Sequence, residues 1–529
     1  MYRKYVQVAV AIATVAALLA GCAPGSSGSG PTSDIPKDGG TLTIAVAKDV
    51  YTLDPGRTND LQSQRVYSLI FDTLVTNNKK FQIISSVAES WSDVGAKEWT
   101  FKLKRGIKFT DGTELTSEDV AYSFQRILDV PEAASQKRSK ISMIERIETP
   151  DKYTVKFYLS FPYAPFLGAA AQHIVPKHVV ESVGEKEFGR KPVGSGPFTL
   201  KEWILDDHVT LSRNETYWRA KPHLGQIVFR PIPDPTVAAM AAIAGEVDVV
   251  EQLQGSTIDK VKGAGVDVKI AEGMTYYPVA FRMYGPPYDN VKFRKMVYYS
   301  TDMDSAIAVV LPNGTGYRAY TPVILGVWPR DVEHAKSVAL KQDKAKAKAL
   351  FEELIAEGVM TKATPVVFLS NEDSVRVKLF EIMVTNLKEI GVNAQLKVLE
   401  YSAWLDSVVK QKVPCICCLG CTAAILDPDA IFNWQFSCGS NLGGNILGLK
   451  RSEIDDMLAQ ARTTTDRGVR ETLYKKIEKW VIEENVYHIP AYTLNTVIAV
   501  NKRVHGLEPS PDGYWRILIE DTNVWVDPK

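Results

Sequence analysis

The chain has 529 residues, of which 45% are hydrophobic and 23% are charged, with 62 basic and 62 acidic side chains. This composition is typical of globular protein, and the length is sufficient for two or three domains. The balanced charge argues against the concentrated basic surface that nucleic-acid binding requires, so we expect no nucleic-acid partner.

The first 21 residues have the order of an export signal. Arg3 and Lys4 precede a largely apolar run, 8–20, which is too short to span a bilayer comfortably. We therefore predict that residues 1–21 are a signal peptide. Its removal would take away two basic residues and no acid, leaving a net charge of about −2. No second stretch of about twenty apolar residues follows, so no membrane-spanning segment is expected in the body.

The segment Leu19-Ala20-Gly21-Cys22 resembles the bacterial lipobox. The resemblance implies that Cys22 becomes the first residue of the mature protein and carries a lipid, which would be its membrane partner. The alternative is a plain cleaved signal followed by an incidental cysteine. Residues 22–39 are rich in Gly, Ser and Pro and are predicted to form a flexible lipoprotein tether.

The body alternates between strand and helix patterns from residue 39 onward. The expected elements, in chain order, are strand 39–46, helix 60–71, strand 99–104, helix 116–127, strand 154–159, helix 235–245, strand 247–250, helix 343–357, helix 375–390 and strand 393–399. Strands and helices mixed throughout the chain predict an α/β body.

Two of these segments carry sharper local signals. The strand 99–104 is followed by the run 107–109 and the turn pair Asp111-Gly112, which predicts a hairpin. In the helix that follows, Ser117 is the candidate N-cap, and apolar residues recur at helical spacing on one face.

The segment EWTFKLKRGIKFTDGTELTSEDVAYSF, residues 98–124, resembles a signature of the extracellular solute-binding proteins that serve dipeptide, oligopeptide and nickel importers. Further matching segments occur in the same order as in that family: VGSGPF (193–198), NETYW (214–218), AGEVD (244–248), PYDNVKFR (287–294), AKALF (347–351), IGVN (390–393) and DPD (427–429). The resemblance covers nearly the whole chain from residue 40.

The resemblance implies a two-lobed α/β fold like that of the periplasmic binding proteins, of type II and the three-domain cluster, with a hinged ligand cleft between the lobes. Lobe 1 would contain domain I, formed by residues 40–70, 193–275 and 495–529, and domain II, residues 71–192. Lobe 2 would be domain III, residues 276–494. Only a ligand that bridges both lobes would stabilise the closed form.

The same resemblance implies a function. The protein would be a substrate-binding lipoprotein of an ABC importer that captures a small polar solute, a peptide or peptide-like molecule, and delivers it to the permease and ATPase complex. It would be a monomer held by lipid at the extracytoplasmic face of the cell membrane, in the periplasm or on the cell surface. No cofactor is expected.

The segment before Asp427 departs from the peptide-binding pattern of this family. Peptide-binding members carry a Gly-Trp pair there, and an aspartate that takes the peptide's amino group. Alignment on residues 427–429 places Cys421 at the tryptophan position and Ala424 at the aspartate position. A buried ammonium group without a counter-charge costs several kcal/mol. We therefore expect Cys421 and Thr422 beside the ligand, and either Asp427 or a residue from elsewhere in the acidic role.

Arginines are the second group of candidates for ligand binding. Arg282 stands in a strand like the one that enters the second lobe in the family, where relatives usually have an asparagine. Its guanidinium could bind a ligand carboxylate through two parallel hydrogen bonds, or it could pair with an acid of the protein. Arg318 and Tyr320, in a nearby loop, are candidates of the same kind.

Aromatic side chains supply flat, rigid contact surfaces in clefts that hold varied ligands. The candidates are Tyr276, Tyr277, Trp404 and Trp434, chosen because they are close to the strand and loops already named. For each of them, packing in the core is the alternative role.

Five cysteines lie in the body: Cys415, Cys417, Cys418, Cys421 and Cys438. The family resemblance implies a disulfide between Cys438 and one of the other four, with the partner undecided. A soft-metal site is a second reading, although no histidine lies nearby in the sequence and the spacing matches no standard zinc site. The third reading is buried thiols packed as small apolar groups. No metal site is expected.

Three other functions are alternatives to solute binding for an importer. A secreted hydrolase is disfavoured, and no enzyme activity is expected, because neither Gly-x-Ser-x-Gly nor His-Glu-x-x-His occurs. A metal- or haem-binding receptor of the same fold would rest on the cysteine cluster alone. A sensor or chaperone that uses the fold without transport is the third.

Overall fold

The structure, a computed structural model, describes residues 35–130, 137–423, 425–519 and 522–529. The chain divides into two compact units, Met1–Pro36 and Lys37–Lys529, and the second unit contains every element described below. The predicted signal peptide, Cys22 and most of the predicted tether lie outside the described residues. Among the described residues, no helix combines the length and apolar character needed to cross a membrane.

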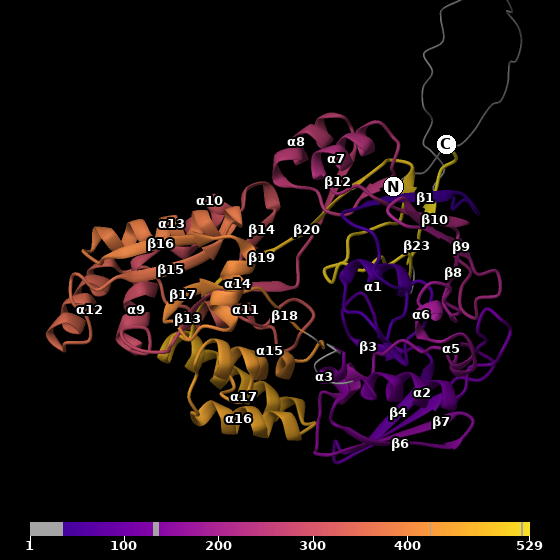
Figure 1. Ribbon diagram of the computed structural model, residues 1–529, viewed down its shortest axis with the longest axis horizontal. Helices are drawn as coiled ribbons and strands as arrows, with labels where there is room; N and C mark the ends of the chain where they lie inside the picture. The colour runs from indigo at the N-terminus through magenta and orange to yellow at the C-terminus, as the bar shows by residue number, and fades with distance from the viewer. Residues whose placement is uncertain (1–34, 131–136, 424, 520–521) are drawn as a thin grey trace, which may run out of the picture. The chain divides into compact units, whose positions relative to one another are not determined.

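A seven-stranded sheet, here the lobe 1 sheet, has the order β12-β20-β11-β1-β10-β9-β8. Its strands are β1 (Thr41–Val46), β8 (Phe198–Ile204), β9 (His208–Arg213), β10 (Gln226–Pro231), β11 (Val249–Val250), β12 (Asp267–Ala271) and β20 (Thr496–Val500). The predicted first strand is confirmed, and its alternate apolar residues Leu42, Ile44 and Val46 are buried. Strand β20 pairs antiparallel with both β11 and β12, so a late segment of the chain completes a sheet begun by the first strand (Figure 1).

A four-stranded antiparallel sheet has the order β4-β5-β7-β6. Its strands are β4 (Ala88–Val94), β5 (Glu98–Leu103), β6 (Ile144–Asp151) and β7 (Thr154–Leu159). The predicted hairpin forms only as a short one across the Asp111-Gly112 turn, where Phe109 N donates to Thr113 O at 2.9 Å and Leu115 N donates to Ile107 O at 2.8 Å. Strand β5 is not an arm of it, because β5 pairs with β4 and β7. The local turn signal was real, but β7, about fifty residues later, is the better partner because it continues a buried apolar face.

Eight helices surround these two sheets in the described part of the chain. They are α1 (Leu61–Tyr67), α2 (Ser117–Leu128), α3 (Arg138–Ile141), α4 (Phe166–Ala169), α5 (Lys177–Val183), α6 (Glu185–Phe188), α7 (Pro235–Ile243) and α8 (Gly255–Gly263). The N-cap of α2 is Thr116, one residue before the predicted Ser117, because Asp119 accepts a hydrogen bond from Thr116 N at 2.9 Å and closes a capping box. Helix α1 ends four residues earlier than predicted.

The buried carboxylate of Asp72 explains two of the matching sequence segments. Ser195 Oγ and Tyr217 Oη each donate to it at 3.0 Å, and Trp218 Nε1 donates at 2.8 Å. The glycine before Ser195 is also required, because a Cβ on Gly194 would lie 2.1 Å from the carbonyl oxygen of Ile70. The side chains of the segments 193–198 and 214–218 therefore hold Asp72 in place within the fold and are not directed at a ligand.

A second seven-stranded sheet, here the lobe 2 sheet, has the order β14-β19-β13-β17-β15-β16, and β18 pairs with β13 beside this path. Its strands are β13 (Thr275–Arg282), β14 (Gly316–Arg318), β15 (Val366–Asn371), β16 (Ala394–Leu399), β17 (Cys415–Cys418), β18 (Cys421–Thr422) and β19 (His488–Leu494). The central strands β13 and β19 are buried on both faces, which makes this sheet the core of lobe 2.

The lobe 2 sheet is covered by α-helices and three short helices of other types. They are α9 (Val291–Ser300), α10 (Met303–Val310), η2 (Pro312–Gly314), α11 (Val332–Val338), α12 (Lys344–Ala356), α13 (Ser374–Glu389), α14 (Tyr401–Val409), α15 (Pro428–Phe436), η3 (Asn441–Ile446), α16 (Glu453–Thr463), α17 (Arg467–Lys479) and η4 (Trp480–Glu484). The predicted helices at α12 and α13 are confirmed. Asp343 caps α12, and Gly391, with φ of 93°, follows α13.

Three two-stranded sheets complete the described strands. They are formed by β2 (Val75–Asn77) with β3 (Ile83–Ser85), β21 (Val504–His505) with β24 (Trp525–Val526), and β22 (Leu518–Ile519) with β23 (Thr522–Asn523). The strands of the three large sheets fall, to within one residue, inside the three residue ranges expected for domains I, II and III.

The chain passes between the two seven-stranded sheets at residues 272–274 and again at Asn495, which we call the crossing segments. They lie in close contact, because a Cβ on Gly273 would be 1.6 Å from the carbonyl oxygen of Leu494. Asn495 also donates through Nδ2 to the carbonyl of Gly314 at 2.9 Å. The two passages are therefore held together as a pair.

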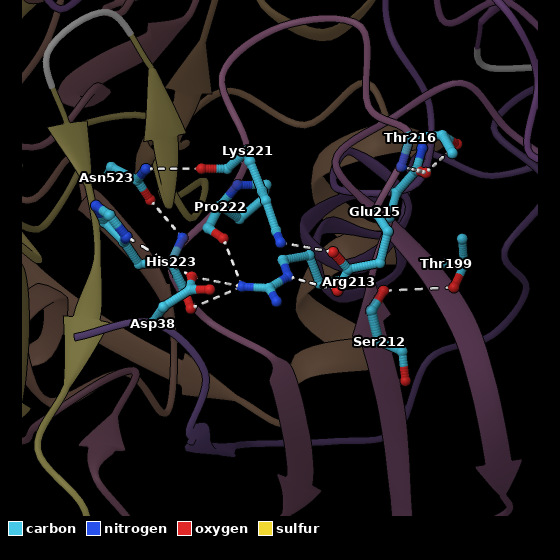
Figure 2. A network of polar contacts seen from close by, with 11 residues as sticks. Asp38, Thr199, Ser212, Arg213, Glu215, Thr216, Lys221, Pro222, His223 and Asn523 are labelled. Atoms are coloured by element: carbon cyan, nitrogen blue, oxygen red, sulfur yellow. Dashed lines mark hydrogen bonds and ion pairs between the residues drawn. The ribbon is translucent and has the colours of Figure 1, made fainter. Parts of the chain in front are cut away.

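Where the chain enters the body, Arg213 on β9 gathers a polar network (Figure 2). Its guanidinium contacts Asp38 at 2.7 Å and Glu215 at 2.9 Å, and donates to the carbonyl of His223 at 3.3 Å. The Oδ1 atom of Asn523 accepts from His223 N at 2.8 Å. This network fixes the first residues of the body against a late segment of the chain.

Candidate ligand-binding site

An arginine between aromatic rings marks the strongest candidate site. Arg376 lies in the first turn of α13, where Asp373 caps the helix and accepts from Arg376 N at 2.9 Å. Its guanidinium carbon is 5.6 Å from the ring centre of Tyr277 and 5.3 Å from that of Trp404. We call Arg376, Tyr277, Tyr492 and Trp404 the Arg376 cluster.

Two tyrosines from neighbouring strands form the floor of this cluster. Tyr277 on β13 and Tyr492 on β19 face each other in the sheet register, and their rings stack with centres 4.8 Å apart and planes 9° apart. The loop between β17 and β18 approaches closely at Gly420, where a Cβ would lie 2.8 Å from the Tyr277 ring. A larger residue at this position would therefore push the ring from its place.

The guanidinium of Arg376 is only partly satisfied within the protein. Nη1 donates to Asn371 Oδ1 at 3.0 Å, whereas the buried Nε has no hydrogen-bond partner among the described residues. An arginine fork matches a carboxylate through two parallel hydrogen bonds, and its charge is favoured over aromatic faces. The arrangement can therefore bind a carboxylate while the rings contact the apolar parts of the same molecule.

The thiol and hydroxyls of this region are neutral near pH 7. Burial raises the pKa of the Cys418 thiol to about 11. Burial also raises the pKa of Tyr277, although the Arg376 charge acts in the opposite direction. The cluster thus combines the positive charge of Arg376 with neutral aromatic and thiol groups, while the nearby carboxylate of Asp373 acts on Arg376, Tyr277 and Cys418.

Arg282 is not available for a ligand in the structure. Its side chain is among the most deeply buried, with 1% of the residue exposed. The guanidinium donates to the main-chain carbonyls of Ile446 at 3.0 Å, Ser407 at 3.2 Å, Val413 at 2.8 Å, and Gln411. The sequence suggested that Arg282 binds either a ligand carboxylate or an acid of the protein. In the structure it binds neither, and instead holds the loop that follows α14 through main-chain carbonyls.

Asp427 is likewise occupied within the protein. It caps α15 by accepting from Asp429 N at 2.9 Å, and its carboxylate receives two hydrogen bonds from Arg470, at 2.6 and 2.9 Å. Asp429 binds Arg462 at 2.9 Å and accepts from Tyr163 Oη at 3.2 Å. The Asp-Pro-Asp segment therefore organises the packing of α15 to α17, and Asp427 is not free to receive an ammonium group. Ala424 lies outside the described residues.

The remaining sequence candidates are distributed around the same sheet. Tyr276 is fully buried, on the face of β13 opposite to Tyr277, and Cys421 is buried beside it. Thr422 is exposed and its hydroxyl lies 3.0 Å from that of Thr275. Trp434 on α15 is 38% exposed. Of the aromatic candidates, only Tyr277 and Trp404 therefore meet at the Arg376 cluster.

The five cysteines of the body are free thiols in the structure, so the predicted bridge from Cys438 is not formed there. Cys415, Cys417, Cys418 and Cys421 are buried in β17 and β18, while Cys438 is partly exposed after α15. Their positions fit the reading of packed thiols. Within the described residues, no group of three or more His, Cys, Asp or Glu side chains is arranged to hold a metal ion.

Arg318 and Tyr320 line a separate cavity of about 370 Å³ that also borders the crossing segments. Arg318 donates to the carbonyls of Pro490 and Ala491 on β19 and lies 3.2 Å from Asp304. Arg318 and Tyr320 therefore line the same cavity. No member of the Arg376 cluster lines it.

Two members of the Arg376 cluster, Arg376 and Tyr492, were missed in the sequence. Arg376 stands at the start of an amphipathic helix, where a basic residue usually indicates a solvated face. Tyr492 belongs to a strand more than two hundred residues from β13. The pairing of β13 with β19 brings Tyr492 to Tyr277, and the packing of α13 brings Arg376 to the same ring.

Two sheets joined by paired crossing segments, with an arginine and aromatic rings on one of them, define a two-lobed α/β binding protein. The profile of the bacterial extracellular solute-binding proteins, family 5, matches residues 82–443. The chain belongs to this family, whose members bind solutes for transport and are not enzymes.

Individual relatives agree with this assignment. The probable D,D-dipeptide-binding periplasmic protein DdpA of Escherichia coli K12 is 29% identical over 498 residues, which cover 90% of this chain and 92% of that protein. The oligopeptide-binding protein AppA of Bacillus subtilis is 25% identical, with 90% of each chain covered. The crystal structure of the substrate-binding protein CtaP of Listeria monocytogenes superposes with a TM-score of 0.82 at 22% identity, covering 93% of this chain and all of that one.

Proposed function

We propose that the protein is the substrate-binding lipoprotein of an ABC importer and that it captures a small peptide or peptide-like solute between its lobes. The observation that carries the ligand class is Arg376, whose buried Nε lacks a partner while its guanidinium lies between two aromatic rings. The names of the relatives, which include dipeptide- and oligopeptide-binding proteins, support the same class.

The ligand would be bound through a carboxylate at Arg376, with Tyr277 and Trp404 contacting its apolar parts. Closure of the lobes would remove water from the ion pair, which strengthens it, and only the closed form would be presented to the permease. Asp427 is held by Arg470, so the amino group of a peptide would need a different partner. We therefore infer a site that selects for the carboxyl end more strongly than for the amino end.

The direct test is titration of the purified protein with matched peptides by calorimetry. Dipeptides and tripeptides with a free carboxyl group should bind, and their carboxyl-terminal amides should bind at least tenfold more weakly. The Arg376→Gln variant should lose this discrimination. Lys378→Gln, an exposed change of the same charge on the same helix, should keep it. Equal binding of acids and amides to the unaltered protein would remove the proposed role of Arg376.

Two broader measurements test the function itself. Mass spectrometry of molecules that co-purify with the protein should identify a small polar solute, and that solute should raise the melting temperature with concentration because it binds the folded state. If no peptide-like solute does so, while haem or a metal does, the receptor alternative replaces the proposal. Small-angle scattering should show a more compact monomer with ligand than without.

The membrane attachment is tested separately. We propose that the signal peptide is removed before Cys22 and that lipid on Cys22 holds the protein at the extracytoplasmic face of the cell membrane. Cys22→Ser should move the protein from the membrane fraction to the soluble extracytoplasmic fraction. Retention of the variant in the membrane fraction would contradict the anchor without affecting the binding site.

A further inference from the structure

The cavity beside the crossing segments has the features of a second binding site. Its volume of about 370 Å³ lies within the range of small-molecule pockets. Its wall is built from the strand β14, the loop and helix that follow, and both crossing segments. The charged and hydroxyl-bearing lining residues used below are Glu272, Tyr317, Arg318, Tyr320, Arg330 and Lys336.

The cations that line this cavity are more buried than the acids that pair with them. Three cations line it, and their side chains are 10% (Arg318), 23% (Arg330) and 46% (Lys336) exposed. Each is paired with an acid that is more exposed than itself: 63% for Asp304, 34% for Glu272 and 84% for Glu333. Of these acids only Glu272 lines the cavity. The acids that pair with Arg318 and Lys336 thus lie outside the lining, whereas Glu272 lies in the wall beside Arg330, so the lining carries three cations and one acid.

Arg330 is the least satisfied of the three cations. It forms an ion pair with Glu272, yet its buried Nε has no acceptor among the described residues. Tyr317 also shares the Glu272 carboxylate. A second anionic oxygen placed in the cavity would therefore find an unused N–H on Arg330, in surroundings where a charge-assisted hydrogen bond is strong.

The wall beside these charges is aromatic. The ring of Tyr320 lies 4.8 Å from the guanidinium carbon of Arg318 and 5.6 Å from Lys336 Nζ, and its hydroxyl donates to Asp304 at 2.7 Å. This ring holds both cations near the cavity while the acids remain outside. The site thus combines a flat apolar surface with two available cationic groups, Arg330 and Lys336.

We propose that this cavity, here the crossing pocket, binds a small organic anion carrying at least one carboxylate, at Arg330 and Lys336. The site is separate from the ligand site of the proposed function and does not depend on it. Because Glu272 lies on a crossing segment, an anion that takes its place on Arg330 would release a tie between that segment and the loop before α11. Occupancy would therefore change how freely the two lobes move.

The test uses succinate as the probe and its neutral diamide as the matched compound, in calorimetric titration of the purified protein. Succinate should bind and the diamide should not. Arg330→Gln should weaken succinate binding at least tenfold, whereas Glu272→Gln should strengthen it several-fold by removing the competing carboxylate. Lys344→Gln, a change of the same charge at a residue outside the lining, should leave binding unchanged.

Each alternative result contradicts the proposal. Equal binding of succinate and the diamide, or the same affinity in the Arg330→Gln and Lys344→Gln variants, would show that the pocket does not select anions. If Arg376→Gln abolishes succinate binding while Arg330→Gln retains it, the anion occupies the Arg376 cluster instead. In that case the crossing pocket is excluded and the proposed function stands.

Discussion

Arg376 and Arg282 belong to the same lobe, and their surroundings differ in one respect that decides their roles. Arg282 donates to four main-chain carbonyls and is excluded from water, whereas Arg376 bonds to the side chains of Asn371 and Tyr492 and keeps an unused Nε. A buried cation whose donors are all directed at the protein stabilises the fold. A cation with unused donors beside aromatic rings is prepared for a partner that comes from outside. The number of hydrogen-bond donors that already have partners in the protein therefore distinguishes a structural arginine from a candidate ligand-binding arginine.

The largest effect is expected from Arg282→Met, which keeps the length of the side chain and removes every donor. Four main-chain carbonyls would lose a charged donor at once, so the free energy of unfolding should fall by about 4 kcal/mol. Urea unfolding measures this, with Arg376→Met as the matched variant, for which we expect a loss below about 1 kcal/mol. If the two variants are equally stable, the distinction between the arginines is lost.

Asp427→Asn tests an acid that is satisfied in the same way as Arg282. Its carboxylate is 10% exposed and bound by both ends of the Arg470 guanidinium, so removing its charge should cost about 3 kcal/mol. Peptide affinity of the folded protein should be unchanged when measured by calorimetry. A large loss of affinity at full stability would instead assign Asp427 to the ligand.

Glu478 is a buried acid that, unlike Asp427, has no arginine bound to it: among the described residues its ion-pair contact is His334, at 3.6 Å. Burial raises the pKa of Glu478 to about 7 from 4.5, and its hydrogen bond with Thr321 only partly opposes this. The folded state therefore holds a proton that the unfolded state releases above pH 4.5, so stability is greatest below that pH and declines as the pH rises through about 7. The decline should amount to about 3 kcal/mol and should be absent in Glu478→Gln, as followed by urea unfolding between pH 4.5 and 8.5.

Arg376→Gln should weaken binding of a carboxylate ligand by about tenfold, equal to roughly 1.4 kcal/mol, with little change in melting temperature. The informative control is Arg376→Lys, which keeps the charge but loses the fork and should recover only part of the affinity. Full recovery in the lysine variant would mean that charge alone, and not two parallel hydrogen bonds, holds the ligand.

The smallest effect is expected from Gly420→Ala. The added Cβ would lie 2.8 Å from the Tyr277 ring, so the stack of Tyr277 on Tyr492 must shift. We expect a few-fold loss of ligand affinity and a change in stability of less than about 1 kcal/mol. Unchanged affinity would indicate that Tyr277 does not contact the ligand.

Much of the fold could be predicted because its local signals agree with the tertiary structure. Strand β1 and helices α12 and α13 carry alternation, caps and a terminal glycine that agree with one another. The turn at Asp111-Gly112 joins only the short runs 107–109 and 113–115, because a turn signal does not determine which strand pairs with β5. The pairing with β7 depends on an apolar face that only the folded sheet reveals.

The site was less predictable, for a physical reason. Arg282 and Asp427 were predicted to bind the ligand, but their partners in the structure are main-chain carbonyls between residues 407 and 446 in one case and Arg470 in the other. Nothing in the sequence around either residue identifies such partners. Tyr277 was a candidate because it lies in a recognisable strand, whereas Arg376 reads as an ordinary surface cation until the packing of α13 brings it beside Tyr277 and Trp404.

The position of β20 between β11 and β12 has a consequence for biogenesis. The lobe 1 sheet cannot be completed until residue 500 has been synthesised, whereas the lobe 2 sheet is built from the single stretch 275–494. An incomplete chain that ends before β20 therefore lacks the strand that joins β11 to β12, while every strand of the lobe 2 sheet is already present. Truncation near the carboxyl end should for this reason damage the sheet that contains the first strand before it damages the sheet in the middle of the chain.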